Sequence, residues 1–206
     1  MKARLPLARA PLMSDAELIE SVLDGEREFF QALVQRHQER LFRVAFGMVM
    51  DDDVAADLVQ DAFMRAFANL GRCRDRDRFR VWLLATLRNR CLDYLREKRR
   101  RDVSIDDVAA MRAVPSGAVA DSDADDLALR TTLETALAKL SPPLREAFVL
   151  RHVEQLTVAE AAEVLGIGES AVKMRVHRAR ELLRDWLAPD LELGSGPATT
   201  PQPDAM

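Results

Sequence analysis

The sequence predicts an all-α protein in which two small helical domains are joined by a flexible acidic linker. Apolar residues recur at spacings of three and four along most of the chain, as they do on one face of an α-helix. No stretch alternates apolar and polar residues as a half-buried strand would, and aromatic residues make up only 5% of the chain. Ala, Leu and Arg, which favour helices, are abundant instead. The length of 206 residues suits one large or two small domains.

Composition divides the chain into five segments, of which two are domains. Residues 102–126 hold seven Asp and one Arg, a net charge of −6, around Pro115, Ser116 and Gly117. Such a composition is typical of a flexible tether. Pro189 is expected to end the last helix. The residues after it include few that could form a core, so they are expected to be disordered. The expected segments are an N-terminal extension (1–13), a first domain (14–101), the acidic linker (102–126), a second domain (127–188) and a disordered tail (189–206).

Four helices are expected in the first domain. Ser14 and Glu17 form a capping box at the start of the first helix. An acidic run that begins at Asp51 suits the start of the third helix, since negative charge interacts favourably with the N-terminal end of the helix dipole. Apolar stripes predict a shared core, which Phe63 and Phe67 help to fill. The expected helices span residues 14–23, 26–50, 54–70 and 80–100.

The second domain ends in two helices joined by a glycine turn. Thr157 and Glu160 form a capping box, and Gly166 can adopt the left-handed conformation that ends a helix. The second helix, beginning near Glu169, carries an apolar stripe with basic residues on its other side. This pattern predicts a helix-turn-helix whose second helix fits a DNA major groove, although an ordinary hairpin with a solvated basic face is the alternative. The expected apolar residues are Ala159, Ala162, Val164 and Leu165 on the first helix, and Val172, Val176, Ala179 and Leu183 on the second.

A basic segment that contains aromatic residues precedes the linker. Between Arg72 and Arg101 there are 12 Arg or Lys and 4 Asp or Glu, a net charge of +8, although the whole chain carries −4. Cations that follow phosphates, interleaved with rings that stack on bases, suit the binding of single-stranded nucleic acid. The rings are Phe79, Trp82 and Tyr94. Each ring taken by itself also fits a core position, with the arginines forming a solvated surface.

Other classes of function are not indicated by the sequence. Cys73 and Cys91 have no second Cys or His at metal-ligand spacing, so we expect no metal site, and reduced thiols in a cytoplasmic protein are the default. His37 and His152 are expected to be surface or packing residues. The chain displays no glycine-rich phosphate loop and no nucleophile with its base, so no catalytic residue, enzyme activity or cofactor is expected. Membrane insertion is not expected either, because no apolar run approaches the roughly 20 residues of a membrane span.

Several motifs, in this order, resemble those of the extracytoplasmic-function (ECF) sigma factors, group IV of the bacterial sigma-70 family. DLVQDAF (57–63), FRVWL (79–83) and RNRCLDYLR (88–96) are similar to sigma region 2. LSPPLRE (140–146) and the helix-turn-helix (156–186) are similar to sigma region 4. The tether between the two regions matches the family as well.

The resemblance implies a transcription initiation factor with no catalytic role of its own. Such a protein binds core RNA polymerase through its beta and beta-prime subunits, directs it to promoters through the −10 and −35 elements, and promotes DNA melting. An anti-sigma factor is the implied inhibitor, and the acidic linker would occupy the RNA exit path. In this family the DLVQDAF helix docks on the polymerase clamp helices. The implied polymerase-binding residues are Asp57, Leu58, Gln60, Asp61 and Phe63.

The same resemblance implies two sets of residues that bind promoter DNA. An unpaired −10 base would be captured near the basic segment, where Cys73 replaces an aromatic residue that is frequent in the family. The helix beginning near Glu169 would enter the −35 major groove, where Met174 replaces a small polar residue. The −10 set is Arg72, Arg76, Arg78, Phe79, Trp82, Arg88, Asn89, Tyr94 and Arg96, and the −35 set is Ser170, Lys173, Met174, Arg175, His177, Arg178 and Arg180.

Three other functions were weighed against this interpretation. A stand-alone regulator would bind a duplex operator without polymerase, commonly as a dimer. An enzyme would need a catalytic set that the sequence does not display. A helical interaction protein without a DNA role would keep its activity after charge reversal at Lys173 and Arg178, whereas a sigma factor would lose −35-dependent transcription.

Overall fold

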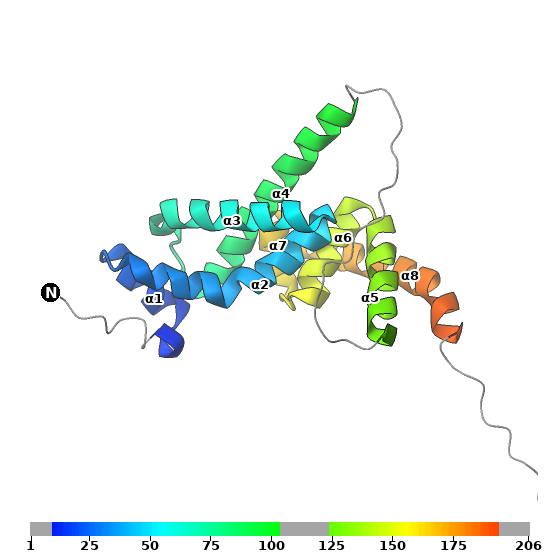
Figure 1. Cartoon of the computed structure of the whole chain (residues 1–206), viewed down its shortest axis with the longest axis horizontal. Coiled ribbons are helices and arrows are strands. Elements are labelled where there is room, and N and C mark those ends of the chain that lie inside the picture. Colours follow the sequence, from blue (N-terminus) through cyan, green and yellow to red (C-terminus); the bar gives the residue numbers. More distant parts are fainter. Residues whose placement is uncertain (1–9, 104–123, 194–206) are drawn as a thin grey trace, which may run out of the picture.

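The computed structural model describes residues 10–103 and 124–193, and every regular element within these two ranges is helical. The prediction of an all-α protein is therefore confirmed (Figure 1). Most of the expected acidic linker, the first nine residues and the tail after Leu193 lie outside the described residues. The main helices are α1 (Asp15–Leu23), α2 (Phe30–Val49), α3 (Asp52–Ala68) and α4 (Phe79–Val103) in an N-terminal lobe, and α5 (Ala124–Lys139), α6 (Pro142–Phe148), α7 (Val158–Leu165) and α8 (Glu169–Leu193) in a C-terminal lobe.

The N-terminal lobe is built on α2 and α3, which lie side by side and both pack against α4 (Figure 1). The first part of α4 supplies the centre of the core, where Phe79, Leu84, Leu87 and Cys91 are fully buried. Its last turns project away from the bundle, and residues 96–101 are exposed. A single helix therefore joins the core of this lobe to an exposed basic end.

The helix boundaries follow the signals predicted from the sequence. Ser14 and Thr157 each complete a capping box, with Glu17 and Glu160 respectively, and each hydroxyl accepts a hydrogen bond of 3.2 Å from the backbone of its glutamate. Gly166 ends α7 at φ 64°, a left-handed conformation that glycine adopts without steric cost. The start and the end of α7, the first helix of the helix-turn-helix, are therefore set by local interactions.

Two expectations for the C-terminal lobe are wrong. Helix α8 does not end before Pro189 but continues to Leu193. Proline removes one helical hydrogen bond and its ring crowds the carbonyl four residues earlier, which usually kinks or breaks a helix, but its fixed φ is itself helical and α8 continues past it. In α7, Ala159 is exposed, whereas Ala161 is fully buried. The apolar face of this helix is thus rotated from the one that we expected.

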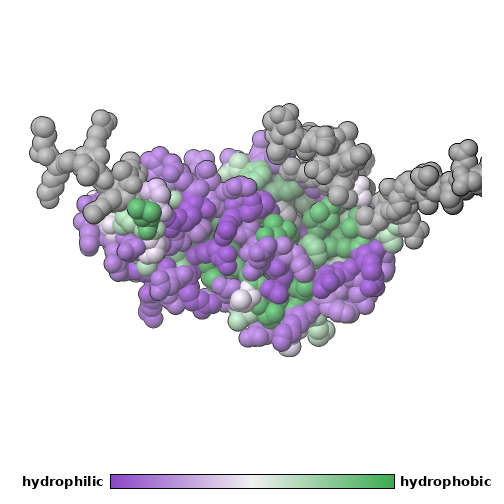
Figure 2. Space-filling view, turned by 90° about the horizontal axis from the view of Figure 1, so that it is seen from below, coloured by the Kyte–Doolittle hydropathy of each residue, from purple (hydrophilic) through white to green (hydrophobic). Residues whose placement is uncertain are grey.

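The two lobes pack directly against each other, through α2 and α4 on one side and α6 and α7 on the other. One continuous cluster of buried side chains extends from the N-terminal lobe to Val149 and Leu150, in the π-helical turn η5 (Val149–Val153) that follows α6. A second, smaller cluster joins α5 to α8. Figure 2 views the molecule from below and shows a mostly hydrophilic surface, with its larger hydrophobic patches toward the middle and the C-terminal lobe.

Candidate protein-binding and nucleic-acid-binding surfaces

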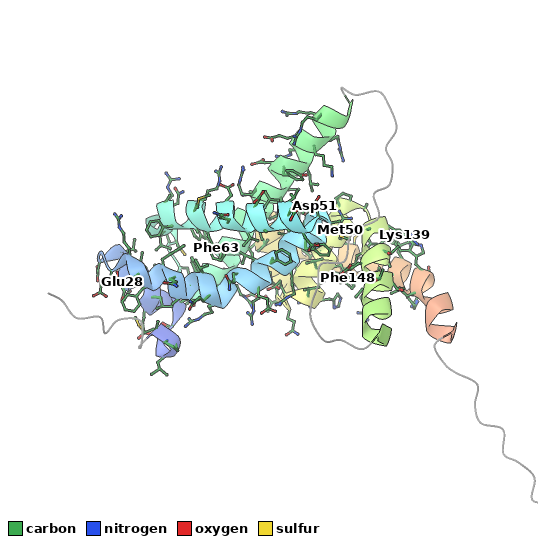
Figure 3. The ribbon with its side chains drawn as sticks, viewed as in Figure 1. Glu28, Met50, Asp51, Phe63, Lys139 and Phe148 are labelled. Carbon is green, nitrogen blue, oxygen red and sulfur yellow. The ribbon has the colours of Figure 1, made fainter. Side chains whose placement is uncertain are left out.

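An apolar groove of about 930 Å³ runs between α2 and α3. Phe63 lies between the two helices (Figure 3), with its ring 6.4 Å from that of Phe30 in an edge-to-face arrangement. Met64 and Phe67 are 57% and 38% exposed, which is unusual for large apolar side chains this close together. The apolar lining consists of Phe30, Val34, Phe42, Ala56, Val59, Phe63, Met64 and Phe67. This groove, here called the α2–α3 groove, can accept an apolar partner.

The expected polymerase-binding residues do not all line the α2–α3 groove. Gln60 and Phe63 do, whereas Leu58 is buried in the core and therefore supports the helix from within. Asp57 is exposed on α3 and is not part of the lining. Met64 is not among the expected binding residues and Phe67 was expected in the core, yet both side chains are exposed at the groove. Because Gln60, Phe63, Met64 and Phe67 follow the spacing of a single helix face, this face could have been recognised.

Asp61 points toward α4 instead of the groove. It accepts hydrogen bonds from Arg90 of α4 and, at 3.1 Å, from Arg65 of its own helix. Partial burial would raise the pKa of Asp61, but the hydrogen bonds from Arg90 and Arg65 outweigh burial and lower the pKa. Asp61 therefore stays ionised and fastens α3 to α4, a role that leaves its carboxylate engaged within the lobe.

The basic segment runs from Arg72, at the end of the 3-10 turn η3 (Leu70–Arg72), through the 3-10 turn η4 (Arg76–Arg78) into α4. Its exposed members include Arg72, Asn89 and Arg96. Trp82 and Tyr94 are half-buried, so each keeps part of its ring accessible. Three further arginines of the expected −10 set have acidic partners on other elements, which are Glu20 for Arg76, Glu163 for Arg78 and Glu146 for Arg88. Arg96 pairs with Asp93 of its own helix at 3.5 Å.

Phe79 does not present a ring face for stacking. It is fully buried, with its ring 5.6 Å from that of His37 and 5.9 Å from that of Trp82. The expectation that Phe79 contacts a base is therefore not met in this conformation, and the ring instead supports Trp82 from behind. Cys73 is also buried, and its thiol donates a hydrogen bond of 3.5 Å to the carbonyl oxygen of Asp75.

The second helix of the helix-turn-helix exposes its basic face. Val172 and Ala179 are fully buried beneath it, as the predicted apolar stripe requires. Met174 is 74% exposed in the middle of the basic residues. Arg175 is half-buried, whereas the other members of the expected −35 set are exposed, namely Ser170, Lys173, Met174, His177, Arg178 and Arg180. The first turns of α8 thus offer a continuous polar and basic surface.

The described part of the chain holds neither a candidate metal site nor a candidate membrane-spanning helix. Across residues 10–103 and 124–193, no three His, Cys, Asp or Glu side chains lie together in a way that could hold a metal ion. No helix in these ranges combines the length and the hydropathy that crossing a membrane requires.

Comparison with known proteins identifies the family. The sigma-70 region 2 model matches residues 33–101, and the sigma-70 region 4 model matches residues 130–183. The ECF RNA polymerase sigma factor SigW of Bacillus subtilis is 28% identical over 177 residues, which cover 82% of this chain and 94% of SigW. The RNA polymerase sigma factor CarQ of Myxococcus xanthus is 34% identical over 175 residues, which cover 85% of this chain and 98% of CarQ. The chain belongs to the ECF sigma factors of the sigma-70 family.

This ECF sigma factor also shares its fold with a solved relative. The sigma factor RpoE of Bartonella quintana, in complex with the anti-sigma factor NepR, superposes with a TM-score of 0.65 at 28% identity, covering 77% of this chain and 98% of RpoE. The α2–α3 groove and the basic segment belong to region 2 of the sigma factor, and the exposed face of α8 belongs to region 4. Proteins of this family are transcription initiation factors.

Proposed function

We propose that this sigma factor binds core RNA polymerase through the α2–α3 groove, with a helical element of the beta-prime subunit as its occupant. The groove carries the proposal because it is apolar, open and flanked by Met64 and Phe67, which water now contacts. An amphipathic helix laid into such a groove buries these side chains and gains hydrophobic free energy.

The test of this site is core binding and run-off transcription with purified polymerase. Met64→Glu places a charge in the groove and is expected to weaken core binding by about tenfold or more, as hot-spot substitutions do. Leu12→Glu is the matched control, because Leu12 is 92% exposed and lies outside the groove. Sequencing of the transcript 5′ ends from the wild-type reaction gives the promoters. Equal loss in both variants, or in neither, would remove the groove from the proposal.

We propose that one face of α4 engages the melted −10 element. Trp82, Asn89 and Arg96 are spaced by seven residues and so share a face of the helix, to which Arg72 adds charge. Extruding a base costs a few kcal/mol, and stacking on a partly exposed ring with phosphate contacts can offset it. Asn89→Ala is expected to reduce permanganate reactivity of the melted region, whereas Gln35→Ala, an exposed amide on α2, leaves it unchanged.

The exposed face of α8 is proposed to read the −35 element. Lys173 and Arg178 can donate to base edges or phosphates, and the exposed Met174 can contact a thymine methyl group. Charge reversal by Lys173→Glu or Arg178→Glu is expected to abolish transcription that depends on the −35 element, whereas Lys139→Glu on α5 retains it. A stand-alone regulator would instead show sequence-specific duplex binding in a gel shift without polymerase, and that result would contradict the proposal.

An anti-sigma factor is the proposed inhibitor of this protein. The support is that the similar sigma factor RpoE was solved in complex with the anti-sigma factor NepR. The test is purification of the tagged protein from its own cells. A stoichiometric partner that abolishes run-off transcription when it is added back would support the proposal, and a co-purifying protein without that effect would not.

A further inference from the structure

Two methionines are exposed among the described residues, and each lies in a surface that is proposed to bind a partner. Met64 borders the α2–α3 groove and is 57% exposed, and Met174 is 74% exposed on the basic face of α8. The other methionines within residues 10–103 and 124–193 are buried or half-buried, and Met48 is almost fully enclosed in the core. The most accessible methionine side chains of the described chain are therefore found at its binding surfaces.

The two thiols of the chain, by contrast, are shielded from solution. Cys73 and Cys91 are both buried, and burial raises the pKa of each thiol, to about 12 for Cys91. Oxidants attack the thiolate rather than the thiol, so these cysteines react slowly while the protein is folded. An oxidant in the surrounding solution thus reaches methionine sulfur more readily than cysteine sulfur.

The α2–α3 groove admits a small oxidant freely. Its volume of about 930 Å³ is many times that of a peroxide molecule, and Met64 stands at its exposed border together with Phe67. Phe63, the preceding residue of α3, is buried and lies between α2 and α3 (Figure 3). The side chain of Met64 is therefore open to solution in the free protein, and a partner that fills the groove covers it.

We propose that Met64 is a reversible oxidation site, at which a peroxide-class oxidant lowers the affinity of this sigma factor for core RNA polymerase. The inference rests on the proposed function of the α2–α3 groove and adds a chemical control of that same site. Oxidation acts on the free sigma factor, because a polymerase helix in the groove covers Met64. Molecules already bound to polymerase are protected, whereas oxidised free molecules no longer compete for it.

The reaction transfers one oxygen atom from the peroxide to the thioether. A lone pair of the Met64 sulfur attacks one peroxide oxygen and the O–O bond breaks. The departing hydroxide takes the proton of the transferred oxygen and leaves as water. Sulfur loses two electrons and the peroxide gains them, which yields methionine sulfoxide. Methionine sulfoxide reductases return the sulfoxide to the thioether with electrons from a dithiol, so the change is reversible.

A sulfoxide at position 64 opposes the docking of an apolar partner. The new oxygen is a polar acceptor, and an apolar helix laid into the groove removes water from it without supplying a donor. Oxidation of methionine disrupts methionine-containing interfaces for this reason. Core binding is expected to weaken by about tenfold, as it does when a hot-spot side chain is lost.

The first test measures core binding after limited treatment of the full-length protein with hydrogen peroxide. Catalase destroys the peroxide before untreated core polymerase is added, so only the sigma factor is oxidised. The wild type is expected to lose about tenfold in affinity and to recover it after treatment with methionine sulfoxide reductases A and B.

Met64→Leu is the matched variant for this test, because leucine is apolar and has no sulfur to oxidise. The measured quantity is the ratio of core affinities after and before peroxide, so each protein serves as its own reference. This ratio should stay near one in Met64→Leu, which retains every other methionine of the chain, including Met174.

The second test uses peptide mass spectrometry, with Met174 as an internal control for Met64. In the free protein both are expected to be oxidised, whereas buried Met48 is not. Core polymerase added before the peroxide should slow the oxidation of Met64 in proportion to the fraction of sigma factor bound. Met174, on the face proposed to bind promoter DNA, should continue to react in this complex.

Three results would overturn the proposal. The first is an unmodified Met64 in peroxide-treated, folded protein. The second is full core affinity in a protein whose Met64 has been converted to the sulfoxide. The third is an equal loss of affinity in Met64→Leu and the wild type, which would assign the effect to another residue. Failure of Met64→Glu to weaken core binding would instead contradict the proposed function of the groove, so the two kinds of failure are distinguishable.

Discussion

Replacement of Gly47 by alanine tests how tightly the two lobes are packed. In an isolated helix this substitution stabilises, because alanine has the higher helix propensity by about 1 kcal/mol. In the folded chain the new Cβ atom would lie 2.8 Å from Cγ2 and 3.3 Å from Cγ1 of Val149. Val149 is almost fully buried, and its branched side chain is stiff about χ1, so it cannot swing away. Helix propensity therefore favours Gly47→Ala, whereas packing against Val149 opposes it.

The effect of Gly47→Ala on the free energy of unfolding is expected to have opposite signs in the wild type and in a Val149→Ala background. Overpacking of a dense interface costs about 1–3 kcal/mol, so Gly47→Ala should lower the free energy of unfolding of the wild type by up to about 2 kcal/mol. In a Val149→Ala background both clashing methyl groups are absent, and the nearest remaining atom is the Cβ at 3.6 Å, an ordinary contact. There Gly47→Ala should raise the free energy of unfolding by about 1 kcal/mol.

Urea unfolding of the four proteins in this double-mutant cycle measures the coupling. Tryptophan fluorescence reports on both lobes, because Trp82 lies in the N-terminal lobe and Trp186 in the C-terminal lobe, and far-UV circular dichroism reports on the helices as a whole. Coincident transitions by the two probes are expected if the lobes unfold together. A stabilising effect of Gly47→Ala that is equal in both backgrounds would refute the close approach of α2 and Val149.

Three other substitutions or treatments have outcomes set by burial and charge. Phe79→Ala empties a fully buried site and should lower the free energy of unfolding by about 3–5 kcal/mol. Phe79→Leu keeps an apolar side chain in the core, so this variant should still melt promoters. Loss of promoter melting in a stable Phe79→Leu protein would show that the ring contacts DNA. Burial tends to raise the pKa of Asp15, but hydrogen bonds from His37 and Arg36 outweigh it and lower the pKa. Its contribution to stability is therefore present above the unfolded pKa and is lost as the pH falls through the lower folded pKa, so Asp15→Asn should reduce the acid sensitivity of unfolding below about pH 4. Burial raises the pKa of Cys91 to about 12, so Ellman's reagent in mildly alkaline buffer should modify it only after unfolding.

Much of the helical framework was predictable because its signals are local. A capping box needs only two residues three apart, and Ser14–Glu17 and Thr157–Glu160 both form as predicted. The end of α7 depends only on the freedom of Gly166 to take a positive φ. The continuation of α8 beyond Pro189 could not be predicted in this way, since the local signal of an interior proline is a break or kink and the helix continues in spite of it.

The α2–α3 groove was harder to predict than the helices that form it. Met64 and Phe67 have the spacing and the hydropathy of core residues, so the sequence alone favours burial. They stay accessible because α2 and α3 diverge enough to leave a groove, which is a property of two helices together. The opposite holds for Phe79. A ring within a basic segment suggests a surface for stacking on bases, but this ring is buried against His37.

The pairing of Arg88 with Glu146 could not be predicted from either lobe separately, because it joins residues 58 positions apart in the chain. This pairing distinguishes two parts of the basic segment by the solvent exposure of their side chains. Arg88 is mostly shielded by its contact with the C-terminal lobe, whereas Arg96 and the basic residues after it, at the projecting end of α4, are exposed. Long-range attraction to DNA acts through exposed charges, so residues 96–101 of α4 are placed to make the first contact. The affinity of the protein for oligo(dT) should accordingly depend strongly on salt, since the exposed end of α4 can contact phosphates in this arrangement of the lobes.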